Sequence, residues 1–205
     1  LASIMRYNFR QELHGHFNHL RTYALADEPG LLVASYPLGR RPTRPFPYCN
    51  EVWTGLEYTA AAHLLYEGQR EDGLRVIAAV RSRFEGARRS PFDEAECGHH
   101  YARAMASWAA VLAHSGFGYS GITGALAFAG ASRPQQLFWS NGAAWGTCAQ
   151  TPTAGGIAVE LEVLHGQLRV AQISLSGVGT LALDSPRVLG AGERLAVTVA
   201  RGAES

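Results

Sequence analysis

The stretch HSGFGYSG, from His114 to Gly121, separates two parts of the sequence that differ in hydrophobic periodicity. Upstream of it, apolar residues recur three and four positions apart, which is the period of an amphipathic helix. Downstream of it, apolar and polar residues alternate, which is the period of a strand with one buried face. We therefore expect a boundary between Gly116 and Gly130, with a helical domain over 1–120 and a β-rich C-terminal segment over 121–205.

Upstream of this boundary the sequence predicts three helices, at about 51–66, 71–84 and 99–114. The first of them contains the helically spaced series Trp53, Leu56, Ala60 and Leu64. The connections between the three segments are short enough for antiparallel neighbours, so the pattern predicts helical hairpins. The three prolines of RRPTRPFPY, residues 40–48, exclude regular structure there.

Downstream of the boundary the sequence predicts short strands in ALAFAG, QLFWS, IAVELEVLHG, QLRVAQISLS, TLAL and LAVTVA. In the third of these, Val159, Leu161 and Val163 alternate with Glu160 and Glu162, so one face is expected to be buried and the other wet. Gly, Pro, Ser and Asn between the segments favour turns. The whole sequence therefore predicts a mainly α fold with a β-rich C-terminal segment of short antiparallel strands.

The composition limits the classes of partner and compartment. A formal net charge of +1 over 205 residues gives no reason to expect nucleic acid or an anionic membrane as a partner, and no apolar run is long enough for a membrane span. Cys49, Cys97 and Cys148 are odd in number and widely spaced, which predicts a reducing compartment, the cytoplasm, rather than a disulfide framework. The chain starts inside a helical pattern and without methionine, so we expect a piece of something longer.

Titratable residues are concentrated in SPFDEAECGHHYAR, from Ser90 to Arg103. If the three predicted helices run up, down and up, the first and the third begin at the same end of the bundle. This loop would then lie beside PYCNEVW, residues 47–53, although the two are far apart in sequence. Free backbone N–H groups and the helix dipole at helix starts favour anionic or hydroxyl-rich ligands.

Three kinds of chemistry fit this stretch poorly. Cys97, His99 and His100 are too few and too close together for a closed zinc site, and the histidines of HGHFNH could complete one only through the tertiary fold. Glu94 and Glu96 are neighbours in one short loop, and such neighbours rarely straddle a sugar ring as the carboxylates of a glycosidase do. Cys97 is not part of a GxS/C-type motif, the sharp turn that exposes a catalytic nucleophile. We therefore expect no metal and no cofactor.

Ligand binding fits the same residues better. Glu94, near the predicted helix start, and Arg103, one turn into that helix, can face one cavity and bind adjacent hydroxyl groups. Glu51 and Trp53 add a carboxylate and an aromatic ring from the neighbouring loop, and sugar recognition uses such side chains. Two other interpretations stay open: Glu94 and Arg103 form a plain ion pair, and Trp53 belongs to the core.

The segment that begins PYCNEVWTGLEYTAAAHLLYEG and ends ASWAAVLAHSGFGY closely resembles the C-terminal part of the catalytic domain in the bile-acid β-glucosidase, or non-lysosomal glucosylceramidase, family of glycoside hydrolases. EVWTGLEY and ECGHHYARAMASW are its most specific parts, and the resemblance begins upstream, at YNFRQEL and RTYALADEPGLL. It thins out after about Gly121. The resemblance implies that residues 1–120 are part of an (α/α)6 toroid, with the active site at the end where the inner helices begin.

The resemblance also implies retaining hydrolysis of β-glucosides by a nucleophile and a general acid/base, which lie upstream of the matched region in such enzymes. No catalytic residue is therefore expected in this chain. What carries over is one wall of a glucose pocket: Glu94 and Arg103 as contacts to the glucose hydroxyls, Glu51 and Trp53 as pocket lining, and His99 and Asp93 as weaker candidates.

We therefore expect a portion of a retaining β-glucosidase-like glycoside hydrolase, acting on β-glucosides or glucosylceramide-type substrates and inactive by itself. Because its helices are too few to close a toroid, its partners would be a carbohydrate ligand and either the missing N-terminal part of the same enzyme or another chain. The alternative is a non-catalytic carbohydrate-binding or assembly module. A third interpretation is a structural piece whose charged loop is a solvated ion-pair network.

Overall fold

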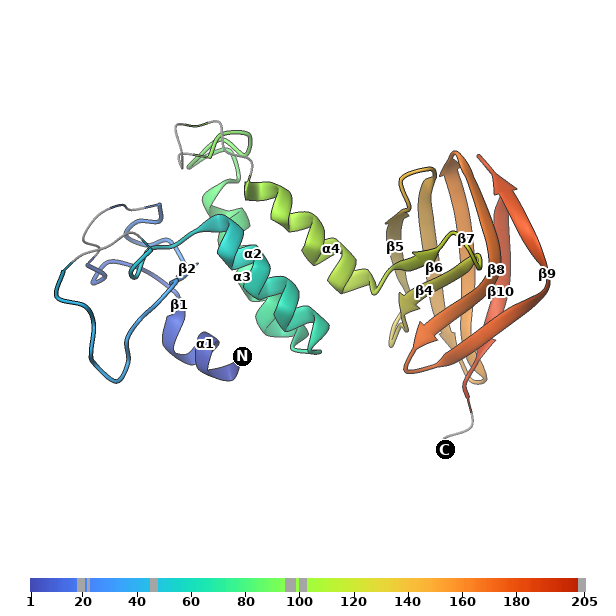
Figure 1. Cartoon of the computed structure of the whole chain (residues 1–205), viewed down its shortest axis with the longest axis horizontal. Helices are drawn as coiled ribbons and strands as arrows, with labels where there is room; N and C mark the ends of the chain where they lie inside the picture. The colour runs from blue at the N-terminus through green and yellow to red at the C-terminus, as the bar shows by residue number, and fades with distance from the viewer. Residues whose placement is uncertain (18–20, 22, 45–47, 95–98, 100–102, 203–205) are drawn as a thin grey trace. The chain divides into compact units, whose positions relative to one another are not determined.

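The computed structural model describes residues 1–17, 21, 23–44, 48–94, 99 and 103–202. The chain divides into two compact units, which we call the helical unit, Leu1–His114, and the sandwich unit, Ser115–Ser205 (Figure 1). Each unit has its own hydrophobic core, and each is described by itself below. Among the described residues, no helix is long and apolar enough to cross a membrane.

The helical unit combines helices with long loops and a minimal sheet. Its elements in chain order are α1 (Ala2–Asn8), β1 (Phe9–Arg10), β2 (Gly30–Leu31), α2 (Thr54–Tyr66), α3 (Arg70–Arg83), the 3-10 helix η1 (Arg103–Ala106) and α4 (Ser107–Ser115). Strands β1 and β2 pair antiparallel, and an isolated bridge from Leu32 to Val52 continues the contact. The predicted helices at 51–66 and 71–84 correspond to α2 and α3, and η1 with α4 occupies the described part of the third.

Helices α2 and α3 form an antiparallel hairpin. Helix α2 ends in a Schellman motif, in which Gly68 N–H bonds to the Leu65 carbonyl and Gln69 N–H to the Leu64 carbonyl. Gly68 has a φ of +73°, which glycine adopts without a steric penalty. At the start of α3, a Cβ on Gly73 would lie 2.9 Å from Leu65 Cγ, so the missing side chain lets the two helices approach closely.

A buried ion pair joins the other end of this hairpin. The Glu57 and Arg83 side chains are 0% and 1% exposed, and both guanidinium Nη atoms donate to the carboxylate. Glu57 also accepts the Leu31 N–H, and Arg83 donates to the Pro29 carbonyl, so the pair ties β2 to both helices. Burial raises the pKa of the Glu57 carboxyl, although Arg83 and the Leu31 N–H act to lower it.

The predicted fold class, a mainly α chain that forms part of an (α/α)6 toroid of helical hairpins, is wrong. The described residues contain four α-helices and three sheets, and more of them lie in strands than in helices. The reason lies between α1 and α2, where prolines at 29, 37, 42, 45 and 47 interrupt the chain and the described residues form loops with two short strands. The helical pattern is sustained only over the α2–α3 hairpin and α4, and this is too little for a ring of hairpins.

The sandwich unit consists of two four-stranded sheets that face each other (Figure 1). Its strands are β3 (Gly118–Ser120), β4 (Ala125–Ala129), β5 (Gln135–Ser140), β6 (Trp145–Thr153), β7 (Gly156–His165), β8 (Gln167–Ser176), β9 (Gly179–Gly190) and β10 (Arg194–Ala200). The strand orders are β10-β7-β6-β5 and β3-β4-β8-β9. Paired strands are antiparallel except β4 and β8, which are parallel, so the expected purely antiparallel arrangement is also corrected.

The core of this unit comes from the alternate residues of both sheets. Val159, Leu161 and Val163 of β7 are at most 2% exposed, whereas Glu160 and Glu162 lie on the other face, as the alternating pattern predicts. Because each sheet buries the apolar face of the other, the strands need no cover from outside this unit. Their lengths reach twelve residues in β9, so they are longer than expected.

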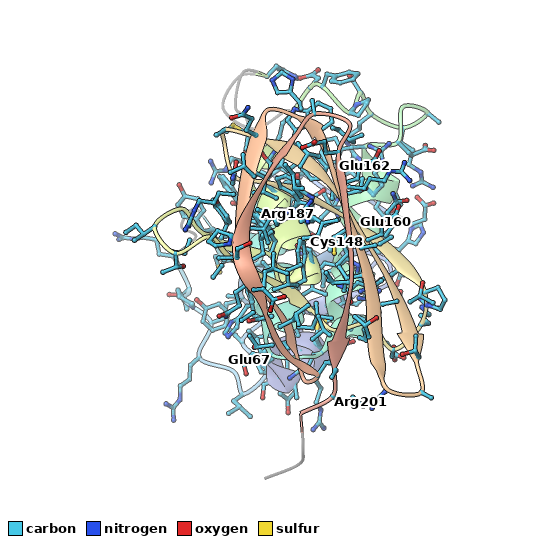
Figure 2. The ribbon with its side chains drawn as sticks, turned by 90° about the vertical axis from the view of Figure 1, so that its right-hand side faces the viewer. Glu67, Cys148, Glu160, Glu162, Arg187 and Arg201 are labelled. Atoms are coloured by element: carbon cyan, nitrogen blue, oxygen red, sulfur yellow. The ribbon has the colours of Figure 1, made fainter. Side chains whose placement is uncertain are left out.

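Two of the cysteines lie in the described residues, and both are free and buried. Cys148 points into the sandwich core, among the side chains between the sheets (Figure 2). Burial raises the pKa of its thiol to about 12, so this cysteine is not reactive as a thiolate at neutral pH. Cys97 lies outside the described residues.

Candidate functional site

The carboxylate of Glu51 accepts four hydrogen bonds inside the helical unit. Glu51 and Trp53 precede α2 directly, and each is 1% exposed. Arg21 donates to both carboxylate oxygens from Nε and Nη2 at 3.1 Å each, Trp53 Nε1 donates at 2.5 Å and the Tyr48 N–H at 3.1 Å. Oε2 accepts three of these bonds and Oε1 accepts one. These bonds make Glu51 a residue that fixes the local fold, and its predicted place in a pocket lining stays a prediction.

The indole of Trp53 lies at the centre of an aromatic cluster. The Tyr23 ring meets it edge-on with a centroid separation of 5.3 Å, and the Tyr48 ring lies 4.7 Å away. The Arg21 guanidinium is 4.8 Å from the indole centroid, and its hydrogen bond with Glu51 raises the pKa of this arginine. Because the ring is enclosed in this way, Trp53 acts as a core residue and not as an exposed stacking platform.

Glu94 differs from Glu51 because its carboxylate has no partner among the described residues. Both of its oxygens are inaccessible to solvent, and neither makes a hydrogen bond within that part of the chain. Its negative charge acts on Glu57 and Tyr58, in the first turns of α2, and contributes to the raised pKa of both groups. Glu94 thus lies near the start of α2, the same helix end that Glu51 and Trp53 precede.

The remaining predicted residues have different surroundings. Asp93 Oδ1 and His99 Nδ1 are 2.7 Å apart, and the two side chains are 48% and 61% exposed, so they form a hydrogen bond on the surface. Arg103 begins η1, and its side chain lies outside the described part of the structure. Glu96 and His100 lie outside the described residues as well.

A polar cavity of about 260 Å³ lies beside the loop that carries Glu51. Its polar lining comes from separate parts of the chain and comprises Arg10, His16, Ser35, Tyr36, Arg41 and Asn50. Arg41 Nε and Nη2 and Asn50 Oδ1 are buried, and in the described part of the structure they make no hydrogen bond. Unsatisfied buried donors and acceptors are rare in folded proteins, so these three atoms mark a place that a polar ligand or water can occupy.

The backbone around this cavity is strained. Tyr36, Tyr48 and Asn50 have φ values of +50°, +71° and +47°, a region that side chains other than glycine seldom adopt. Two hydrogen bonds hold the Asn50 loop: the Asn50 carbonyl lies 2.7 Å from His16 Nε2, and Asn50 Nδ2 donates to the Phe17 carbonyl at 2.8 Å. The strain is therefore imposed by the surrounding contacts, as is common at binding sites.

The sequence contained partial signals for this cavity. The arginine cluster at Arg40, Arg41 and Arg44 predicts a solvated or ligand-facing loop, and the histidines of HGHFNH stand out as a group. Nothing in the spacing connects either stretch with Asn50, which is close to them only in the folded chain. No three described residues among His, Cys, Asp and Glu converge in a geometry that could hold a metal ion.

An ion-pair network anchors the chain that leads to Glu94. The Glu28 carboxylate accepts both Nη groups of Arg89 and the Leu25 N–H, and Asp27 pairs with Arg88 at 2.7 Å. Burial acts to raise the pKa of Glu28, but the bonds from Arg89 and Leu25 outweigh it and hold the pKa below the ordinary value of about 4.5. The network therefore depends on an ionised Glu28.

Glu28 predicts an acid dependence of the helical unit. A carboxyl group with a lowered pKa in the folded state stabilises the fold above its unfolded pKa, and this stabilisation is lost as the pH falls through the folded value, below about 4.5. We expect Glu28→Gln to lower the unfolding temperature at pH 7, and the difference from the unmodified protein to shrink toward pH 3. Thermal unfolding at several pH values measures this, with Glu71→Gln on the surface of α3 as the control. A difference that stays constant with pH would contradict it.

Comparison with protein-family models and with curated proteins finds no match for this chain. The resemblance to β-glucosidases therefore rests on the residues quoted above.

Proposed function

We propose that the helical unit supplies the sugar-binding wall of a retaining β-glucosidase-like glycoside hydrolase, for β-glucosides or glucosylceramide-type substrates, without the catalytic carboxylate pair. The observation that carries the proposal is Glu94, the residue for which the resemblance implies contact with the glucose hydroxyls. Its two carboxylate oxygens are removed from solvent and unpartnered. Hydroxyl groups of a sugar are the donors that would satisfy them.

The energetics support a ligand at Glu94. A buried carboxylate without hydrogen bonds is unfavourable by several kcal/mol, because burial removes the water that would solvate its charge. Vicinal hydroxyls can donate one bond to each oxygen, and bonds to charged acceptors contribute about 1.5–3 kcal/mol each. The ion pair with Arg103 is the structural alternative, and the experiment below separates the two.

The arginine partners of the other buried glutamates in the helical unit support the part of the proposal that assigns no catalytic carboxylate pair to this unit. A retaining glycosidase needs two carboxyl groups about 5–5.5 Å apart across the scissile bond, with both accessible to the sugar. Among the described residues of the helical unit, Glu28, Glu51 and Glu57 are buried, and each is bound by an arginine: Arg89, Arg21 and Arg83. We therefore assign binding rather than bond cleavage to this unit.

Exposed apolar side chains support a further part of the proposal, the missing N-terminal portion of the same enzyme as a partner. Leu56 on α2 is 42% exposed, Trp108 on α4 61% and Met105 on η1 68%. Large apolar side chains on neighbouring helical elements are typical of surfaces that another element covers. Co-expression with the upstream coding region would test this, since burial of Trp108 would blue-shift its fluorescence.

The binding prediction concerns Glu94→Gln. We expect the chain to bind methyl β-glucoside, and the substitution to weaken the affinity about tenfold or more, because an amide replaces the charged acceptor while keeping its size. Isothermal titration calorimetry measures the affinity, and Glu71→Gln, an exposed carboxylate on α3, is the control. We also expect no turnover of p-nitrophenyl β-glucoside.

Two outcomes would contradict this proposal. Equal affinity of Glu94→Gln and the unmodified chain would remove Glu94 from the sugar contact. Clear turnover that Glu94→Gln abolishes would show that the chain does contain a catalytic group.

The alternative function is a non-catalytic carbohydrate-binding module, and the polar cavity favours it. Arg41 and Asn50 offer unpartnered donors and an acceptor in a space of about 260 Å³, independently of Glu94. If the sugar binds there, Arg41→Gln weakens methyl β-glucoside binding while Glu94→Gln leaves it unchanged. The same calorimetry therefore distinguishes the two functions.

A further inference from the structure

An aromatic strip crosses the outer face of the sheet β10-β7-β6-β5. Phe138 of β5 and Trp145 of β6 are 43% and 42% exposed, with ring centroids 6.5 Å apart. His165 of β7 continues the strip, with its ring 6.0 Å from the Trp145 ring and the two planes within 20° of parallel. Three exposed rings on three adjacent strands make a continuous contact surface, and single exposed apolar residues do not.

The backbone around Trp145 holds this strip in place. The pairing of β6 with β7 shifts register between Trp145 and Gly146, an irregularity of the kind that redirects a side chain. A Cβ on Gly146 would lie 1.9 Å from the Glu162 carbonyl oxygen, so only glycine permits this close approach. The preceding turn is fixed by Asn141 Oδ1, which accepts the N–H groups of Ala143 and Ala144.

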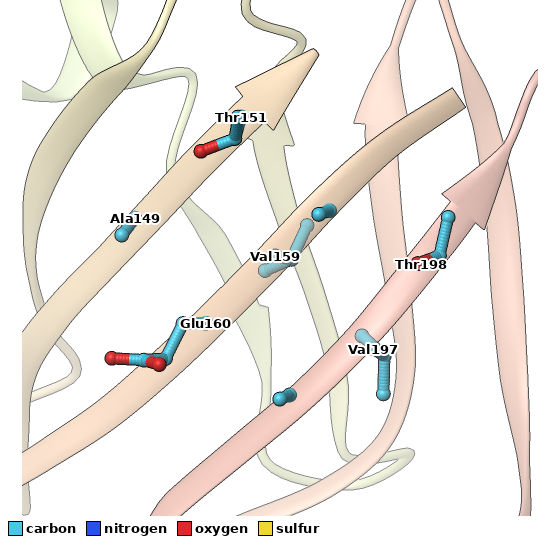
Figure 3. Close-up of a pocket in the computed structure, with 8 residues that line it drawn as sticks. Ala149, Thr151, Val159, Glu160, Val197 and Thr198 are labelled. Atoms are coloured by element: carbon cyan, nitrogen blue, oxygen red, sulfur yellow. The ribbon is translucent and has the colours of Figure 1, made fainter. Parts of the chain in front are cut away.

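A groove continues from the strip along the same face. It measures about 660 Å³, and its outward-facing residues are Ala149, Thr151, Ala158, Glu160, Ala196 and Thr198 (Figure 3). Its volume is in the range of ligand-binding clefts, about 300–1,000 Å³. Trp145 and Thr151 are six residues apart on β6 and share a face, so strip and groove together extend about 20 Å along the strands.

The charged groups on this face leave hydrogen-bond acceptors for a ligand. Arg194 bridges two carboxylates, donating to Glu160 Oε1 at 3.1 Å and to Glu162 Oε1 at 3.0 Å. Figure 2 shows both glutamates on the outside of the sandwich. In the described residues the second oxygen of each carboxylate makes no hydrogen bond, and the three charges sum to −1. The face thus combines aromatic rings with acceptors and a slight negative charge.

We propose that this face of the sandwich unit binds a neutral glycan chain. Rings of the aromatic strip contact the apolar faces of sugar units, and the free oxygens of Glu160 and Glu162 with the hydroxyls of Thr151 and Thr198 bind the sugar hydroxyls. The excess of negative charge disfavours acidic glycans, because their carboxylates or sulfates would be repelled. The site uses residues of the sandwich unit alone, so it is separate from Glu94 and extends beyond the function proposed above.

The test uses Trp145→Ala in the full chain. We titrate the protein with hexamers of β-1,4-linked glucose, β-1,3-linked glucose and β-1,4-linked mannose, and with hyaluronan as the acidic glycan. We expect at least one neutral hexamer to bind, and Trp145→Ala to weaken this binding about tenfold or more, as for a central aromatic contact. Trp145→Phe keeps a ring and should retain most of the affinity.

Two controls separate this site from the rest of the molecule. Val188→Ala changes an exposed apolar residue on β9, in the other sheet, and should leave the affinity unchanged. Trp145→Ala should leave the binding of methyl β-glucoside unchanged, so failure of the glucoside proposal and failure of this one are told apart by the two ligands. Absence of binding to every neutral hexamer, binding of hyaluronan alone, or an affinity that Trp145→Ala leaves unaltered would each overturn the proposal.

Discussion

Replacing Glu57 with alanine is expected to destabilise the helical unit by about 3–5 kcal/mol. The substitution leaves the Arg83 guanidinium buried at 1% exposure without its counter-charge. It also leaves the Leu31 N–H without an acceptor, which loosens β2 from the helical hairpin. Few single substitutions in this unit remove a charge partner and a backbone bond together, so the effect should exceed that of ordinary core truncations.

Urea unfolding followed by circular dichroism at 222 nm measures this loss. The transition of the helical unit should move to lower urea, while that of the sandwich unit stays in place, because the hydrogen bonds of Glu57 and Arg83 join parts of the helical unit. Asp72→Ala is the control, since it breaks the exposed pair with Arg75, and such pairs contribute about 0–1 kcal/mol.

A second variant separates the charge effect from lost packing. Glu57→Leu combined with Arg83→Met removes both charges and fills similar volume, so it should be less destabilising than Glu57→Ala alone. Equal losses for the single and double variants would show that the ion pair does not hold the hairpin through its charges.

The hairpin itself could be predicted from sequence because its signals are local. The three-and-four spacing of apolar residues sets the helices, and Gly68 followed by a new amphipathic pattern sets the turn. The extension of this hairpin to a toroid was wrong because it came from the resemblance and not from the pattern. The described residues between 9 and 53 form loops and two short strands, not the helical hairpins that such a ring needs.

For the sandwich unit, the sequence could predict individual strands but not their arrangement in two sheets. Alternation identified β7 because its apolar residues are large and its polar ones are charged. Strand β6, WGTCAQTPT, was missed because Gly146, Thr147 and Pro152 weaken the strand pattern, although the strand lies between β5 and β7. Which strands pair, and that two sheets enclose one core, depend on contacts between distant residues that no local pattern contains.

The candidate site also could be predicted only in part, because the surroundings of its side chains depend on residues far away in the sequence. Glu51 and Trp53 have the residue types of a sugar pocket, but both are buried by Arg21, which lies thirty positions upstream of Glu51. Glu94 has the same residue type as Glu51, and only its lack of a partner distinguishes it. The sequence therefore predicts that carboxylates near the start of α2 bind a sugar. Only the tertiary contacts distinguish the carboxylate that described donors already bind from the one that they leave without a hydrogen bond.

The aromatic strip and the stability of the sandwich both depend on one glycine, so Gly146→Ala gives the second large prediction. The added Cβ would lie 1.9 Å from the Glu162 carbonyl oxygen and 2.9 Å from Trp139 in the core. The nearest atom belongs to the backbone and cannot rotate away, so β6 and β7 must separate locally and lose ladder hydrogen bonds. We expect a loss of about 3 kcal/mol or more in the unfolding free energy of this unit.

Denaturant unfolding followed by tryptophan fluorescence measures this loss, since Trp139 is 1% exposed in the folded unit. Gly155→Ala is the matched control: it lies in the turn between β6 and β7, and its added Cβ would meet no atom within 4 Å, so the change should stay within about 0.5 kcal/mol. If Gly146→Ala is as stable as Gly155→Ala, the register shift that places Trp145 is not as described. If it is destabilised but folded, the displaced Trp145 should also weaken hexamer binding, because the same backbone irregularity positions the ring.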